Sequence, residues 1–168
     1  MAAIYTEIKK RLGGLFGYLD TTANPVADQI NGTLEHVTSF TKVAADAMAS
    51  TTTASTAFWR APRDCDVINA EYSTVGAIAA DPTDIVGIVL NKADGAGGAA
   101  TPIGTYSTLT GGVGMGAIVS NIPAVVPIST VAATVRLAAG NVLTFQITKG
   151  GAGKVTPVGQ MNVTVRWA

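Results

Sequence analysis

Residues able to do chemistry are few in this chain, and the most suggestive group is residues 91–94, whose sequence is NKAD. The group follows the apolar run at 85–90, as the guanine-reading NKxD motif does in GTPases. A GTPase also needs a glycine-rich phosphate loop that ends in Gly-Lys-Ser or Gly-Lys-Thr, whereas here Lys154 is followed by Val155. We therefore interpret residues 91–94 as the end of a strand that enters an ordinary turn at Asp94.

A second group imitates a dinucleotide-binding fingerprint. Gly112, Gly114 and Ala117 have the GxGxxA spacing. In a true site these glycines open a helix toward the pyrophosphate, but here Pro123 follows and no acidic residue lies about 20 positions further on. We expect glycines that permit close backbone contact within a strand, and we predict no cofactor.

Metal ligands are equally scarce. His36 and Cys65 occur once each, and zinc needs three or four such ligands. Asp64 and Asp66 flank Cys65 without the twelve-residue acidic spacing of a calcium loop, so we predict no metal site and interpret them as the solvated start of a strand. A single cysteine also excludes a disulfide within the chain.

Paired carboxylates are the one chemistry that short motifs do not exclude, because glycosidases bring acids together from distant strands. The supply is small: the glutamates are Glu7, Glu35 and Glu71, and no acidic residue follows Asp94. His36 would have to be the base of any triad, and no nucleophile motif accompanies it. We predict that the protein is not an enzyme and has no small-molecule substrate.

Composition favours contacts with other proteins. Hydrophobic residues make up 48% of the chain, charged residues 13%, and the formal net charge is +0. Nucleic-acid binding is not expected, since contact with phosphates requires a basic excess. The residues after Asp94 carry +4, so the first 94 carry −4. Either the two halves neutralise each other inside one fold, or they form complementary faces between subunits.

The first 36 residues are predicted to be an arm with one short amphipathic helix over residues 3–19 and a linker behind it. Lys9, Lys10 and Arg11 lie opposite the apolar stripe, and Gly13 and Gly14 weaken the helix. The arm therefore needs a partner surface, either a membrane or a protein, and we favour protein. The stripe, which we expect to contact this protein's own domain or another protein chain, consists of Ile4, Ile8, Leu12, Leu15, Phe16 and Leu19.

Residues 37–168 are predicted to form one all-β domain, an antiparallel β-sandwich of jelly-roll type. Short runs rich in Val, Ile, Thr and aromatics alternate with turn residues about every ten positions. The Gly- and Ala-rich segment 93–102 is expected to be a hairpin loop. No apolar run approaches the ~20 residues of a membrane span and no signal-peptide pattern is present, so we expect a cytosolic protein. The expected strands are 37–46, 56–61, 65–76, 84–91, 103–109, 113–119, 128–137, 141–149 and 160–167.

Aromatic residues give the remaining candidate contacts. Phe58 and Trp59 are neighbours on one expected strand, so one should enter the core while the other lies outside or at an interface. Trp59 and Trp167 are therefore candidate interface aromatics, with stacking on a sugar ring as the alternative.

The order of elements in residues 56–168 resembles a known family. The segments TAFWRAPRDCDVINAEYSTVG, IVGIVLNKADG and ISTVAATVRLAAGNVLTFQITKGGAGKVTPVGQMNVTVRW are similar to the small β-sandwich decoration, cement or head-fibre proteins of tailed bacteriophages. The resemblance implies a homotrimer or other homo-oligomer, made in the host cytoplasm, that binds the major capsid protein on the outer face of the virion and stabilises the lattice. A carbohydrate- or receptor-binding sandwich of a phage fibre is the alternative.

Overall fold

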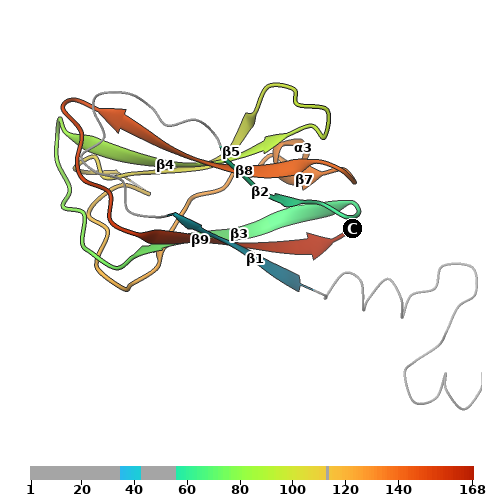
Figure 1. The fold of residues 1–168 in the computed structure, drawn as a ribbon, viewed down its shortest axis with the longest axis horizontal. Helices are drawn as coiled ribbons and strands as arrows, with labels where there is room; N and C mark the ends of the chain where they lie inside the picture. The colour runs from blue at the N-terminus through green and yellow to red at the C-terminus, as the bar shows by residue number, and fades with distance from the viewer. Residues whose placement is uncertain (1–34, 43–55, 113) are drawn as a thin grey trace, which may run out of the picture.

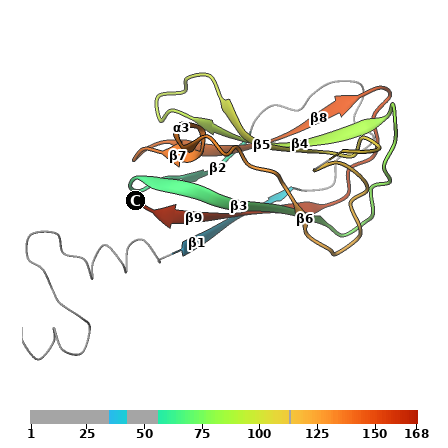
Figure 2. The ribbon, with the colours of Figure 1, turned by 180° about the vertical axis from the view of Figure 1, so that it is seen from behind.

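The computed structural model describes residues 35–42, 56–112 and 114–168, and these residues form two antiparallel sheets that lie one above the other (Figures 1 and 2). The predicted arm helix, including its apolar stripe, lies outside the described residues. The first sheet has the order β1-β9-β3-β6, with β7 also paired to β3. The second sheet has the order β2-β8-β4-β5.

The strands of the first sheet are β1 (Glu35–Lys42), β9 (Gly159–Trp167), β3 (Cys65–Thr74), β6 (Ala124–Val125) and β7 (Arg136–Leu137). Those of the second sheet are β2 (Thr56–Arg60), β8 (Val142–Gly150), β4 (Ile85–Ala93) and β5 (Thr101–Ser107). One helical turn, α3 (Ala132–Val135), precedes β7.

Strand pairing is nested along the chain. The first strand, β1, pairs with the last, β9; β2 pairs with β8, β3 with β6, and β4 with β5, all antiparallel. Each pair encloses the next in sequence, and successive pairs alternate between the two sheets. The chain therefore behaves as one long folded-over ribbon whose two layers meet at a common core.

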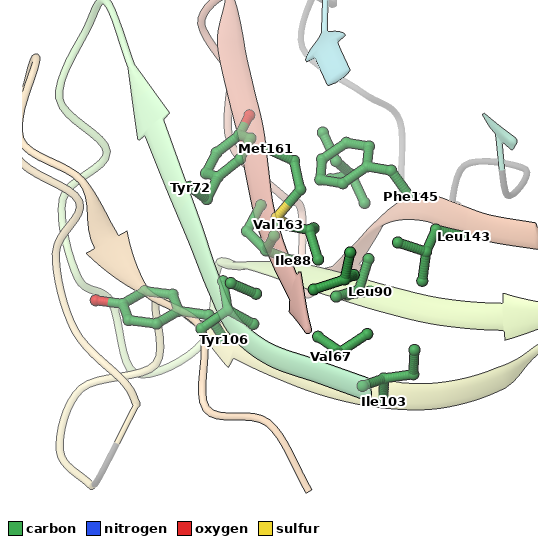
Figure 3. Close-up of a cluster of buried hydrophobic side chains, with 14 of the residues drawn as sticks. Val67, Tyr72, Ile88, Leu90, Ile103, Tyr106, Leu143, Phe145, Met161 and Val163 are labelled. Carbon is green, nitrogen blue, oxygen red and sulfur yellow. The ribbon is translucent and has the colours of Figure 1, made fainter. Parts of the chain in front are cut away.

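The core follows from the period-two alternation of the strands. Met161, Val163 and Val165 of β9 are fully buried, as are Leu143 and Ile147 of β8. Figure 3 shows Met161 and Val163 in one cluster with Leu143 and Phe145. Tyr72 of β3 stacks on Phe145 of β8 across the layers, with ring centroids 5.6 Å apart. One face of β8 and one face of β9 are therefore buried in the common core.

Two expected strands are wrong. In the segment 113–119, the described residues make only isolated bridges, because Gly114 and Gly116 have positive φ angles of 67° and 134° that interrupt an extended strand. The segment 128–137 contains one bridge at Ile128, the helical turn α3 and the two-residue strand β7. Its alternating Val, Ala and Thr residues fit a helical turn as well as a strand.

The segment 124–129 closes one flank of the two layers. Its backbone forms hydrogen bonds with both sheets: Val126 N donates to Ala70 O of β3 at 2.8 Å, and Ser129 N donates to Ile103 O of β5 at 2.8 Å. The outer edges of β3 and β5 are thereby covered on this side, which is how β proteins avoid unwanted strand pairing. Strands β1 and β2 form the opposite flank.

Candidate functional site

Residues 91–94 end β4 and lead into a turn, as the sequence predicts. Lys92 Nζ donates to the carbonyl oxygens of Ala133, at 2.6 Å, and Arg136, at 2.9 Å, so its ammonium holds α3. Asp94 Oδ1 accepts from the backbone N–H of Gly98 at 2.6 Å inside the β4–β5 hairpin. Both side chains are therefore used to hold loops.

The acidic pair that flanks Pro82 also holds loops. Asp81 Oδ1 accepts from the backbone N–H groups of Thr83 and Asp84, both at 2.9 Å, and Lys154 Nζ lies 3.2 Å from Asp81 Oδ2. The Asp84 and Thr83 N–H groups, followed by Lys154, hold the pKa of Asp81 well below its usual range. Asp84 Oδ1 accepts from Ala152 N at 2.7 Å. Within 56–112 and 114–168, no three His, Cys, Asp or Glu side chains gather as metal ligands.

Cys65 is fully buried at the start of β3, opposite Trp167 of β9. Burial, followed by the neighbouring Asp66 charge, raises the pKa of its thiol from 9.0 to about 11. The sulfur is thus a protonated core group at neutral pH and a poor nucleophile.

Two ion pairs balance part of the charge asymmetry of the sequence within the domain. Arg136 Nη1 lies 3.2 Å from Asp66 Oδ2, and Lys154 makes the ion pair with Asp81 already described. Each pair joins an acid from the first 94 residues to a base from the remainder. This arrangement favours internal neutralisation over complementary subunit faces.

The two predicted interface aromatics come together at the end of the molecule where the C-terminus lies (Figure 1). The Trp59 and Trp167 rings, from β2 and β9, have centroids 6.3 Å apart and planes 37° apart. The Arg63 guanidinium carbon lies 4.5 Å from the Trp167 ring centroid, within range of a cation–π interaction. We call Trp59, Trp167 and Arg63 the indole cluster; it joins strands of different sheets.

The prediction that Phe58 and Trp59 divide between core and exterior is wrong. Both are half-buried and both pack against the core, because the β2–β8 register shifts between Ala57 and Trp59. Such a bulge re-aims the side chains around it. A shallow groove of about 340 Å³ runs beside them, along Arg60 and Val142.

The opposite end of the molecule, where β3 ends and β9 begins, is apolar. Four aliphatic side chains are exposed there on three loops, and we call them the apolar end: Val75 (62% exposed), Val119 (53%), Ile122 (58%) and Val155 (57%). Backbone hydrogen bonds hold the loops side by side, from Val75 N to Val158 O at 3.0 Å and from Asn121 N to Thr74 O at 2.7 Å. A groove of about 350 Å³ opens between them, lined by Val75, Asn121, Pro123 and Val158 among others.

Sequence reasoning did not find the apolar end. The available signal was a set of β-branched residues next to Gly and Pro, as in Val75-Gly76 and Ile122-Pro123, in segments too short to be strands. Several aliphatic residues in short loops that lie side by side are the sequence signal of an exposed apolar patch.

No helix in the described ranges has the length and hydropathy needed to cross a membrane. The chain was also compared with known proteins. A scan against models of protein families, a search of curated proteins and a search of solved structures each found no match.

Proposed function

We propose that this protein is a capsid decoration, or cement, protein of a tailed bacteriophage, which binds the outer capsid surface and stabilises the lattice. In this proposal the two sheets form a β-sandwich of jelly-roll type, preceded by an arm with a short helix. The nested pairs β1–β9, β2–β8, β3–β6 and β4–β5 support the jelly roll, since this topology arises when one long ribbon folds over itself. Jelly rolls serve in viral capsids and in lectins.

The observation on which the proposal rests is the apolar end. Val75 lines the groove, and three more aliphatic side chains that are 53–58% exposed lie on the two loops that supply Asn121 and Val158 to its lining. The acids Asp81 and Asp84 hold loops. Exposed apolar side chains gathered in this way are typical of surfaces that bind a protein, a membrane or a ligand, and of these we infer contact with protein. The partners proposed are the major capsid protein and further copies of this chain, and the place of action is the virion surface.

Co-sedimentation with purified capsids of the corresponding phage tests the proposal. The intact chain should pellet with capsids and saturate at a fixed ratio to the capsid protein. A variant that lacks residues 1–34 keeps β1, which begins at Glu35, and should bind more weakly if the arm contributes. An intact chain that stays in the supernatant at micromolar concentration would overturn the proposal.

A second candidate function, binding of a carbohydrate on a phage fibre, has one observation in its favour: the two indole rings lie together near a groove. Against it, Arg63 lies over the Trp167 ring, so that ring is less open to a sugar. A glycan array probed with the intact chain and with Trp59→Ala decides the matter. Only this candidate predicts a glycan signal that the variant loses.

A further inference from the structure

The arm leaves the body at the end opposite to the apolar end. In the β1–β9 pair, Glu35 lies against Arg166 and Lys42 against Gly159. Gly159 lines the groove of the apolar end, whereas Arg166 lies beside Trp167 of the indole cluster. The two points are separated by the length of β1, about 23 Å at about 3.3 Å per residue.

The groove and the arm have matching chemistry. Val75, Pro123 and Val158 form the apolar part of the groove's lining, beside polar residues such as Asn121 and Gln160. Val119 and Ile122 are exposed on the loop that contributes Asn121, and the nearby Lys154 is paired with Asp81. The sequence of residues 4–19 places six apolar side chains on one helical face, which is the surface that such a groove can bury. The match is apolar and not electrostatic, because the cations of the arm, Lys9, Lys10 and Arg11, lie on the other face.

We propose that the apolar stripe of residues 4–19 of one copy docks in the groove at the apolar end of a neighbouring copy. Strand β1 runs toward its own groove, so the chain that precedes Glu35 joins the body at the end away from that groove. Residues 20–34 reach up to about 50 Å when extended, enough to bridge adjacent copies. The contact is head-to-tail, and such contacts form closed rings when the rotation between copies closes.

This inference goes beyond the proposed function, because it concerns contact between copies and requires no capsid. It also specifies the role of the arm, whose partner the sequence leaves open between capsid and subunit. Docking of this kind buries apolar area, so the association should persist in 1 M NaCl, where charge-driven contacts are screened.

Sedimentation velocity of the full-length chain and of three full-length variants tests the proposal. The arm variant carries Ile8→Asp and Leu12→Asp; the end variant carries Val119→Asp and Ile122→Asp. The control, Val131→Asp, alters a residue that is equally exposed, at 58%, but lies at the start of α3. The native chain and the control should associate alike, while the arm and end variants should each associate at least about tenfold more weakly, since each places charge in an apolar contact.

Mixing the two defective variants distinguishes a neighbour from the same chain. The arm variant keeps an intact groove and the end variant keeps an intact arm, so an equimolar mixture should form one-to-one dimers at concentrations where each variant alone is largely monomeric. A native chain that is monomeric at 100 µM overturns the proposal, as does a mixture that stays monomeric. Circular dichroism and thermal unfolding of each variant show whether the fold is retained, and a variant that is unfolded is replaced by Val75→Lys or Leu15→Lys.

The outcome is independent of the capsid assay. Self-association that depends on the arm and the apolar end, without capsid binding, would refute the proposed function and leave this inference standing. Capsid binding by a chain that is monomeric in solution would support the proposed function and refute this inference.

Discussion

The hydroxyl of Tyr72 gives the sharpest test of the core. The side chain is fully buried, stacked on Phe145, and its oxygen has no hydrogen-bond partner in the structure. A buried hydroxyl without a partner costs about 1–3 kcal/mol, whereas the ring itself contributes apolar burial. Tyr72→Phe removes the hydroxyl and keeps the ring, so the variant should be more stable than the native protein by about 1 kcal/mol, or about 3 °C in Tm.

The stability difference between the native protein and Tyr72→Phe should also depend on pH. Burial raises the pKa of Tyr72 from 10.0 to about 12. Above pH 10 the unfolded chain loses this proton while the folded protein retains it, so the stability of the native protein falls between pH 10 and pH 12. At pH 11 the loss amounts to about 1.4 kcal/mol, and the advantage of Tyr72→Phe should widen by that amount between pH 7.5 and pH 11.

Urea unfolding at both pH values measures these differences, and Tyr106 provides a matched control. Its hydroxyl donates to the carbonyl oxygens of Gly116, at 3.3 Å, and Ala117, at 3.4 Å. Tyr106→Phe should therefore lower the free energy of unfolding at pH 7.5, by about 0.5–1 kcal/mol. The reasoning is refuted if Tyr72→Phe is destabilised as much as Tyr106→Phe, because its hydroxyl must then have a partner.

Three further predictions concern the loops and the indole cluster. Asp81→Asn should lower Tm at pH 7, and the difference from the native protein should narrow steadily as the pH falls below about 4 toward the lowered pKa of Asp81, as thermal scans from pH 7 to pH 2 would show. Gly114→Ala should lower the free energy of unfolding in urea by more than about 2 kcal/mol, because φ is +67° and the added Cβ would meet Pro127. Gly97→Ala, at φ +89° with open space around it, should lower it by only about 1 kcal/mol. Trp59→Ala should cost about 2 kcal/mol and weaken the near-ultraviolet circular dichroism of the coupled indoles; an unchanged spectrum would show that the rings are not packed together in solution.

Strong alternation made most of the sheets predictable from sequence. In β9, Met161, Val163 and Val165 alternate with Gln160, Asn162 and Thr164, and only one register buries the first set. The same logic located β2, β3, β4, β5 and β8 to within a few residues. Which strands pair was not predictable, because alternation gives each strand an inward face but does not name its neighbour.

The errors arose where the chain leaves regular structure. Residues 114–119 have strand-like composition, but Gly114 and Gly116 have positive φ angles. The presence of a glycine in the sequence does not by itself show whether its φ angle is positive. The two-residue strands β6 and β7 are too short for any period to be visible. The meeting of Trp59 and Trp167 depends on the approach of two sheets, which sequence spacing does not encode.

The position of the last strand has a consequence for synthesis on the ribosome. Strand β9 lies between β1 and β3, so the final residues of the chain form the middle of the first sheet, and Glu35 must find Arg166 across nearly the whole sequence. Contacts of such high sequence separation slow folding. The first sheet therefore cannot assemble until β9 has been synthesised, and removal of residues 159–167 would leave both β1 and β3 without the strand that lies between them.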